Sequence, residues 1–163
     1  MKAYLAGPDV FRPDALEWAA QARALCRAHG VEALVPLDGD ATTPAGIYGQ
    51  NIAMIRAADV VLANLNHFRG AEPDSGTCFE IGHAVALGKR VIAYLAQPGC
   101  CCERVARWQG EALAEVGPRR FDRDGLLVED FGLPLNLMLA VPARIVVGGL
   151  AEALATLGTG KAD

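Results

Sequence analysis

The segment DVVLANLNHFRGAEPDSGTCFEIGHAVALGKRVIAY, residues 59–94, decides the fold. It begins and ends with runs of mostly β-branched and apolar residues, 59–64 and 90–94, which are typical of strands buried on both faces because they do not alternate with polar residues. Between them, a polar loop over residues 65–76 leads into a predicted helix over residues 77–87, which ends before a glycine. A strand, a helix and a second strand in this order predict a βαβ unit with parallel strands.

The rest of the chain repeats this alternation. Upstream, two strands and two helices are predicted: strands over residues 2–6 and 31–35, and helices over residues 13–29 and 47–57. Downstream the pattern is weaker, and it predicts helices over residues 103–116, 133–140 and 151–157, a strand over 144–147, a charged turn over 119–125 and a frayed tail over 158–163. The predicted fold class is therefore α/β, a three-layer sandwich around a mostly parallel sheet of five strands, in which ligands bind at the carboxyl ends of the strands.

Length and composition bound the class of protein. The 163 residues predict a single domain over residues 1–163, and 52% hydrophobic against 21% charged residues indicates a globular chain. The net charge of -4 gives no electrostatic reason to bind a nucleic acid polymer or an anionic membrane. The mean hydropathy of +0.23 is high, but Pro142 and Arg144 interrupt the longest apolar stretch, so we expect no membrane span. A parallel sheet buried on both faces, together with an oligomer interface, would account for the excess of apolar residues. Residues 1–9 lack the pattern of a secretory signal, which favours a cytoplasmic protein.

The five cysteines favour neither a disulfide framework nor a metal site. Their number is odd, and no secretory signal precedes them. Three of them form the run Cys100-Cys101-Cys102, which lacks the C-x-x-C spacing of a zinc site. We therefore expect reduced cysteines and no bound metal.

Asp74 and Glu80 are the leading candidates for catalysis. Asp74 lies at the mouth of the predicted helix and Glu80 just inside it, so both carboxylates can face the cleft at the strand ends. Two carboxylates in such a cleft suit glycosyl chemistry, in which one attacks the anomeric carbon and the other manages a proton on the leaving group. The alternative is structural: Asp74 caps the helix, and Thr77 and Glu80 form a capping box.

Other residues at this cleft leave alternatives open. Tyr4 is either a core aromatic or a hydroxyl aimed at a catalytic carboxylate. Arg69 either binds an anionic group or fixes its loop by pairing with Glu72 or Asp74. His83 follows Glu80 by one helical turn and could tune this carboxylate, but a single helical histidine is more often a packing or surface residue, and we leave it out of the catalytic set. The glycines form neither a dinucleotide fingerprint nor a P-loop, so no cofactor is expected.

An ordered set of short motifs spans most of the chain. They are YLAGP at residues 4–8 with Phe11, IY at 47–48 with Asn51, AD at 58–59, ANL at 63–65, FRG at 68–70, EPDSGT at 72–77, EIG at 80–82, ALGK at 86–89 and EDFGLPLNLM at 129–138. In this combination the chain resembles the nucleoside 2-deoxyribosyltransferase family. The D-x-G-T-x-x-E core together with the N-terminal YLAGP and the late NLM is the most specific part of the resemblance.

The resemblance implies a flavodoxin-like (Rossmann-like) fold and a transferase that moves 2-deoxyribose between nucleobases with retained configuration. Glu80 matches the family's nucleophile, which forms a covalent deoxyribosyl ester. Asp74 matches the acid that contacts the base and assists its protonation. Tyr4 matches the hydroxyl that orients the nucleophile.

The resemblance also implies the residues that bind substrate. Asn136 matches a residue donated to the neighbouring subunit's site, where it holds the sugar 5′-hydroxyl, and Met138 lies beside it. A homo-oligomer built of dimers, up to a hexamer, is therefore implied. The remaining substrate-binding residues are Gly7, Phe11, Asn51, Arg69 and Gly76. Two positions depart from the family pattern, since Asn51 stands where some members carry an Asp that helps bind the base, and His83 replaces a common Tyr.

Two other functions remain open at the level of sequence. The nearest is an N-glycosidase that hydrolyses (deoxy)nucleoside 5′-monophosphates with the same carboxylates. Asp9, close to Gly7, would repel the phosphate, which argues against this alternative. Arg12 and Arg69 could bind the phosphate, so the alternative is retained. The other is a non-catalytic nucleotide-binding module on the same scaffold, because fold does not fix function. The choice between purine and pyrimidine bases, the tolerance of ribonucleosides and the number of subunits also stay open.

Overall fold

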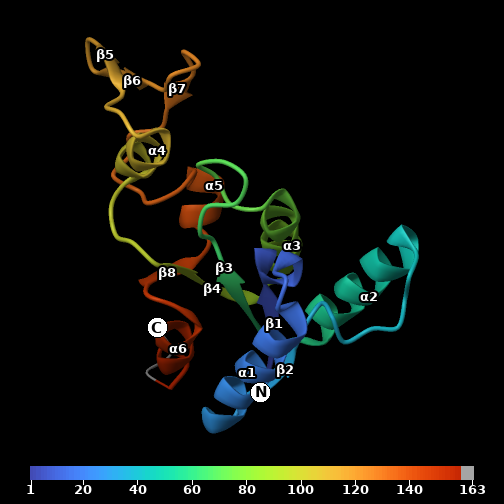
Figure 1. Cartoon of the computed structure of the whole chain (residues 1–163). Coiled ribbons are helices and arrows are strands. Elements are labelled where there is room, and N and C mark those ends of the chain that lie inside the picture. Colours follow the sequence, from blue (N-terminus) through green and yellow to red (C-terminus); the bar gives the residue numbers. More distant parts are fainter. Residues whose placement is uncertain (159–163) are drawn as a thin grey trace.

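Five parallel strands form the central sheet of the computed structural model, which describes residues 1–158 (Figure 1). The strands are β1 (Lys2–Ala6), β2 (Glu32–Leu34), β3 (Val60–Asn64), β4 (Arg90–Leu95) and β8 (Arg144–Val147). They are ordered β2-β1-β3-β4-β8, which is the strand order of flavodoxin-like sheets. The predicted α/β class is confirmed, and the sheet is parallel throughout.

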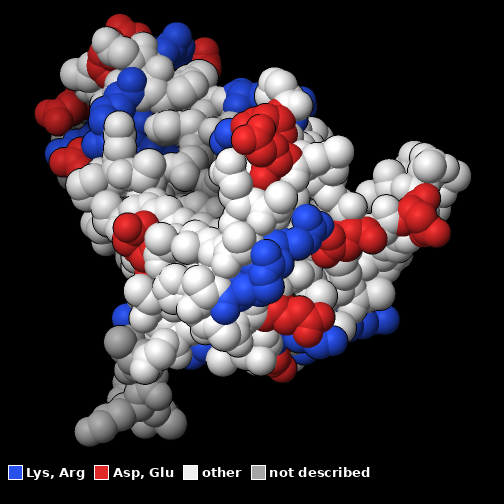
Figure 2. All heavy atoms as spheres, turned by 60° about the horizontal axis from the view of Figure 1, so that its bottom comes forward, with Lys and Arg blue, Asp and Glu red and all other residues white. Residues whose placement is uncertain are grey.

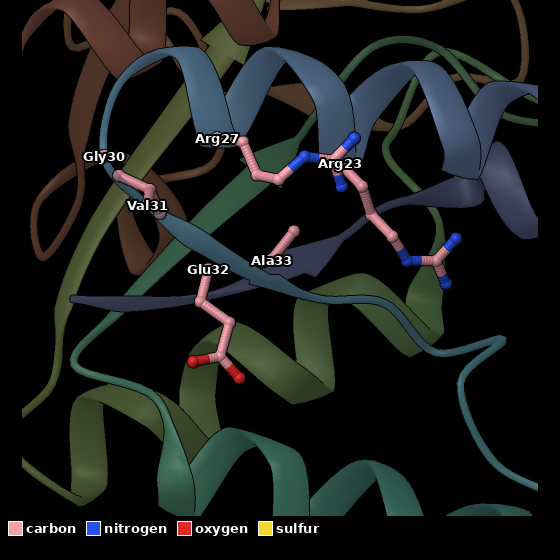
Figure 3. Close-up of a pocket in the computed structure, with 6 residues that line it drawn as sticks. All are labelled: Arg23, Arg27, Gly30, Val31, Glu32 and Ala33. Carbon is pink, nitrogen blue, oxygen red and sulfur yellow. The ribbon is translucent and has the colours of Figure 1, made fainter.

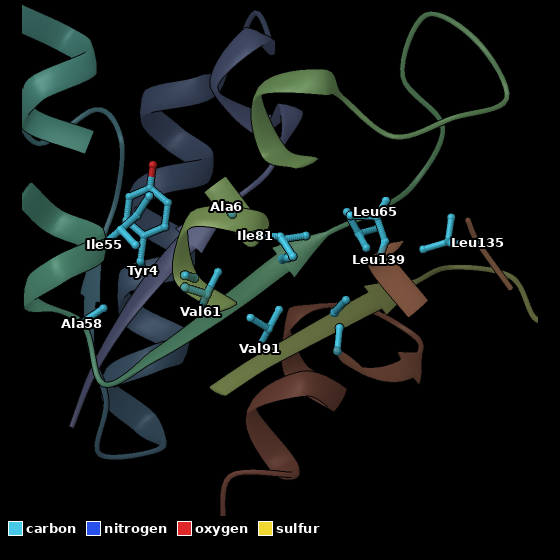
Figure 4. Packing of buried hydrophobic residues seen from close by; sticks show 14 of the residues in the cluster. Tyr4, Ala6, Ile55, Ala58, Val61, Leu65, Ile81, Val91, Leu135 and Leu139 are labelled. Atoms are coloured by element: carbon cyan, nitrogen blue, oxygen red, sulfur yellow. The ribbon is translucent and has the colours of Figure 1, made fainter. Parts of the chain in front are cut away.

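Helices cover both faces of the sheet and complete the three layers. On one face lie α1 (Ala15–Ala28) and α6 (Leu150–Ala155), which pack on Ala3 and Leu5 of β1. On the other face lie α2 (Pro44–Ala57), α3 (Ser75–Ala86) and the short α5 (Leu137–Ala140). Their core residues include Ile55, Ile81 and Leu139, which belong to one buried cluster with Tyr4 of β1 (Figure 4). Successive residues of β1 therefore serve opposite cores, as expected for a strand covered on both sides.

An extension lies beyond the carboxyl end of β4, and the sequence analysis predicted its helix but not its sheet. It consists of α4 (Cys101–Gln109) and an antiparallel sheet of β5 (Ala114–Val116), β6 (Arg119–Phe121) and β7 (Leu127–Val128), seen at the top of Figure 1. The predicted helix over 103–116 is wrong after Gln109, because Gly110 takes a left-handed conformation with φ 77° and ends α4. The predicted charged turn over 119–125 is wrong in its first half, which forms β6.

Of the other predicted elements, β1 and β8 have the predicted ends, and the rest are present with shifted ends. The helix α2 begins at Pro44, because the Thr43 side chain accepts a hydrogen bond from the Gly46 amide at 3.2 Å. A short 3-10 helix, η1 (Pro8–Phe11), follows β1. The helix predicted over 133–140 is reduced to α5. Within residues 1–158, no helix is long and apolar enough to cross a membrane. Of the predicted frayed tail, residues 159–163 lie outside the described residues.

Candidate active site

A cavity of about 430 Å³ lies at the carboxyl edge of the sheet, where the segments after β1 and β2 meet the helices α2 and α3. Its wall includes six of the residues that sequence analysis assigned to the site: Gly7, Phe11, Asn51, Asp74, Gly76 and Glu80. This is the edge at which ligands bind in open parallel sheets. The fold thus brings the two predicted carboxylates to one cavity.

Tyr4 and Glu80 form a hydrogen bond behind this cavity, which Glu80 lines and Tyr4 does not. Tyr4 is fully buried in β1, and its hydroxyl donates a hydrogen bond to Oε1 of Glu80 at 2.5 Å. Figure 4 shows the ring of Tyr4 rising from β1 beside Ile55. Burial and the nearby Glu80 carboxylate raise the pKa of Tyr4, so the phenol keeps its proton and remains a donor. Tyr4 therefore combines both alternatives, because its ring belongs to the buried core and its hydroxyl binds the Glu80 carboxylate.

The electrostatics of Glu80 are unusual for a carboxylic acid. Burial raises the pKa of Glu80 to about 7, the hydrogen bond from Tyr4 opposes this rise, and the negative charge of Asp74 adds to it. At neutral pH the free protein therefore holds Glu80 near the midpoint of its titration. A carboxylate in a cleft with so perturbed a pKa is a candidate for a functional group.

Asp74 caps α3 and lines the cavity at the same time. Its Oδ2 accepts hydrogen bonds from the Thr77 amide at 2.9 Å and the Thr77 hydroxyl at 3.0 Å. The predicted cap is therefore present, whereas the capping box with Thr77 is not, because Asp74 is the N-cap and Glu80 binds Tyr4. Both of these bonds use Oδ2, so Oδ1 is the oxygen that can face a ligand.

Gly7 forms part of the wall because a side chain would not fit there. A Cβ on Gly7 would lie 2.8 Å from the Cβ of Asn64 and 2.9 Å from Oδ2 of Asp9. Asp9 is itself buried and accepts a hydrogen bond from Nδ2 of Asn64 at 2.8 Å. The cavity wall at Gly7 is thus backed by a fixed carboxylate.

Two aromatic rings and a guanidinium lie at the cavity mouth. Phe11 and Phe68 stack with their ring centroids 5.3 Å apart. The guanidinium of Arg69 lies 4.6 Å from the Phe68 centroid and 5.5 Å from the Phe11 centroid. Arg69 does not line the cavity, and within residues 1–158 it forms no ion pair with Glu72 or Asp74. Arg69 contacts the site through the ring of Phe11, which lines the cavity. The backbone φ of Arg69 is 54°, a value that non-glycine residues rarely adopt.

Two partly buried polar side chains flank the site from α2 and α3. Oδ1 of Asn51 and Nε2 of His83 are both buried and have no hydrogen-bond partner within the described chain. Asn51 lines the cavity, whereas His83 does not and stacks on Phe79 with centroids 6.2 Å apart.

Asn136 and Met138 belong to a different hollow, of about 820 Å³, between α3, α5 and the extension. Nδ2 of Asn136 donates to Oε1 of Glu129 at 2.7 Å, and Oδ1 accepts from the Met138 amide at 3.0 Å. The side chain of Met138 is largely exposed. Glu80 does not line this hollow, so a single chain does not bring Asn136 to its own Glu80. Glu129 is the first residue of the EDFGLPLNLM motif, but the sequence alone predicts no role for it.

A third hollow, of about 600 Å³, lies between α1 and β2 and holds none of the predicted site residues (Figure 3). It is lined by Arg23, Arg27 and the segment from Gly30 to Ala33, and Arg23 forms an ion pair with Asp38. On the face that Figure 2 shows, basic side chains lie among acidic ones without a broad area of one sign. Within residues 1–158, the two candidate catalytic carboxylates therefore lie at the cavity of Glu80 and not at this hollow.

Comparison with known proteins agrees with this geometry. A family model described as nucleoside 2-deoxyribosyltransferase matches residues 3–138, a range that includes every predicted site residue. A 2-deoxyribosyltransferase from Leishmania mexicana has a similar structure, with 37% identity, 99% of both chains covered and a TM-score of 0.81. A CMP N-glycosidase from Clostridium botulinum shares the fold at 16% identity, with 98% of this chain and 100% of that chain covered and a TM-score of 0.54. An uncharacterised protein of Schizosaccharomyces pombe is 29% identical over 154 residues, which cover 83% of this chain and 73% of that protein.

Proposed function

The chain belongs to the nucleoside 2-deoxyribosyltransferase family, and from this premise we propose that it transfers 2-deoxyribose between nucleobases through a covalent ester on Glu80. The observation that carries the proposal is the hydrogen bond from Tyr4 to Glu80 in a cavity that also contains Asp74. One carboxylate is oriented by a buried donor, and a second is fixed by a helix start. Such a pair fits the two roles that glycosyl transfer with retention requires.

In the first half of the reaction, the ionised carboxylate of Glu80 attacks C1′ of a deoxynucleoside. The bond between C1′ and the base breaks, and its electron pair leaves with the base. Tyr4 donates to Oε1 of Glu80, so it favours the ionised form and holds the carboxylate in one orientation. The product is an ester between Glu80 and C1′ with inverted configuration.

Asp74 supplies the proton for the departing base. Its Oδ2 is held by Thr77, which leaves Oδ1 to deliver a proton to a ring nitrogen of the base. In the second half, an incoming base attacks C1′, releases the Glu80 carboxylate and returns a proton to Asp74. Two inversions at C1′ give net retention, as in other double-displacement glycosyl reactions.

A free 5′-hydroxyl is favoured over a 5′-phosphate. Asp9 places a buried carboxylate behind Gly7 in the cavity wall, where a phosphate would be repelled. The sequence analysis retained a monophosphate N-glycosidase as an alternative because Arg12 and Arg69 could bind a phosphate. In the structure, Arg12 forms an ion pair with Asp14 at 2.8 Å, and Arg69 stacks on Phe68. The substrates proposed are therefore deoxynucleosides and free nucleobases, in cytoplasmic nucleotide salvage, with no cofactor.

We further propose that the active unit is a homo-oligomer, dimer-based and up to a hexamer, in which Asn136 completes the neighbouring site. Asn136 and Met138 line a hollow that does not contain Glu80, which supports a role toward a second chain. Mixing the Glu80→Ala and Asn136→Ala variants tests this assignment. Mixed oligomers contain sites with both groups intact, so activity should return on mixing. Two variants that stay inactive after proven subunit exchange would contradict it.

A base-exchange assay tests the main proposal. The protein is incubated with a deoxynucleoside and a different free base, and products are separated by chromatography. We expect a new deoxynucleoside from the wild type and from Glu111→Ala, a control at an exposed glutamate, but not from Glu80→Ala. Intact mass after rapid quenching should show one added deoxyribosyl group, which Glu80→Ala should lack. Base release at equal rates with and without acceptor would instead indicate a hydrolase.

A further inference from the structure

We propose that Glu129 is a positioning residue that acts through Asn136. The inference rests on the proposed function, which places Asn136 on the sugar of a neighbouring site. Glu129 follows β7 in the extension and is partly buried, seven residues before Asn136. It lines the larger hollow together with Asn136 and Met138.

Both oxygens of the Glu129 carboxylate bind the start of α5. Oε1 accepts from Nδ2 of Asn136 at 2.7 Å, and Oε2 accepts from the Leu137 amide at 2.9 Å. Hydrogen bonds to an ionised acceptor are stronger than neutral ones, and a helix start favours negative charge. One side chain thus holds the Asn136 amide and the backbone next to it.

These contacts leave the Asn136 amide only one orientation. An ionised carboxylate only accepts hydrogen bonds, and a peptide N–H only donates. Asn136 meets one of each, since Nδ2 faces Glu129 and Oδ1 faces the Met138 amide at 3.0 Å. A flipped amide would set oxygen against oxygen and N–H against N–H. The second hydrogen on Nδ2 is therefore presented in a fixed direction, where a sugar hydroxyl can accept it.

The extension holds Glu129 in place. Val128, the preceding residue, is buried against Cys101 and Val105 of α4. The carbonyl of Glu129 accepts a hydrogen bond from Sγ of Cys102 at 3.5 Å. Packing and backbone contacts from α4 thus position Glu129, and the Glu129 carboxylate in turn positions the Asn136 amide. This assigns the extension a task in substrate binding.

The test compares Glu129→Gln with a matched control, Asp130→Asn. Gln replaces one acceptor by a donor, so either Nδ2 of Asn136 or the Leu137 amide loses its partner. The control makes the same change of charge one residue later and breaks an ion pair to Arg120, but it leaves Asn136 untouched. Each protein is assayed with a 2′-deoxynucleoside and with the 2′,5′-dideoxynucleoside that lacks the 5′-hydroxyl.

The measured quantity is the ratio of kcat/KM for the two substrates, which reports what the 5′-hydroxyl contributes. We expect Glu129→Gln to lower this ratio about two- to tenfold, the range for losing a hydrogen bond between neutral groups, and Asp130→Asn to leave it unchanged. An unchanged ratio in Glu129→Gln, or an equal loss with both substrates, would overturn the inference. Failure of the proposed function would be visible separately, as no Glu80-dependent exchange in the wild type.

A second variant covers the case in which Glu129→Gln does not fold. Glu129→Asp keeps the charge but is one methylene shorter, so it cannot reach Asn136 and the Leu137 amide together. We expect a smaller fall in the same ratio. A wild-type ratio in this variant would also overturn the inference.

Discussion

Replacing Glu80 by Gln should stabilise the folded protein at alkaline pH while abolishing base exchange. Gln has nearly the same shape and keeps an oxygen that can accept the hydrogen bond from Tyr4. The change removes a group whose pKa burial raises from 4.5 to about 7. The folded protein therefore binds this proton more tightly than the unfolded chain does.

The sign and size of the effect follow from this difference. Below pH 4.5 Glu80 is protonated in both states, and its favourable contribution to stability is fully present. As pH rises through about 7, this contribution is lost, because the buried side chain must ionise. The rise in pKa corresponds to about 3 kcal/mol in the free energy of unfolding. Glu80→Gln does not titrate, so it should exceed the wild type by up to about 3 kcal/mol at pH 8 and match it near pH 4.

Urea unfolding at fixed protein concentration measures this difference, with tryptophan fluorescence as the signal. Midpoints are compared at the two pH values for the wild type, Glu80→Gln and Glu111→Gln, whose glutamate is exposed. The reasoning would be refuted by equal stabilities at pH 8, or by a gain of the same size at both pH values. The first result would mean that burial does not penalise the charge, and the second that the gain comes from packing.

Three further predictions concern this cavity and the Arg69 side chain that stacks on Phe11 beside it. In pH-rate profiles, kcat/KM for base exchange should rise with pH through about 7 as Glu80 ionises. Tyr4→Phe should shift this rise to higher pH by about one pH unit, because it removes the hydrogen bond that favours the ionised carboxylate. Gly7→Ala should destabilise the fold by about 1–3 kcal/mol in urea and weaken substrate binding, because its methyl group would lie 2.8 Å from Asn64. Arg69→Gly should be more stable than Arg69→Ala by about 1 kcal/mol. Both variants lose the stacking on the rings, but only glycine adopts the backbone φ of 54° without strain. Equal urea midpoints for the two variants would contradict strain at this residue.

The central sheet could be predicted because burial on both faces gives its strands a distinctive pattern. The strands β1 and β8 begin and end at the predicted residues, Lys2–Ala6 and Arg144–Val147. The extension lacks this pattern, since β5 is short and exposed, and β6 carries two arginines. Gly110 was nevertheless a stop signal for α4, and it would have separated the helix from β5.

The site was predictable to the extent that it depends on where strands end. Tyr4 and Glu80 are 76 residues apart, yet parallel topology brings both to one edge of the sheet. Arg69 lies in a loop, where no periodicity predicts that its guanidinium would stack on Phe68 rather than pair with an acid. The contact of Glu129 with Asn136 likewise spans an irregular segment, so the motif revealed both residues but not their hydrogen bond.

The helix cap formed by Asp74 does not exclude the proton-transfer role proposed for the same side chain. The sequence offered helix capping and proton transfer as competing explanations, but a carboxylate has two oxygens and the structure uses only Oδ2 for the cap. Gly76 leaves space beside this carboxylate, because a Cβ there would lie 3.1 Å from Oδ2, the capping oxygen. A side chain held by a helix start loses little freedom when a ligand arrives, which is what a catalytic group requires. The cap therefore restricts the rotation of the Asp74 carboxylate, which supports the proton-transfer role proposed for it.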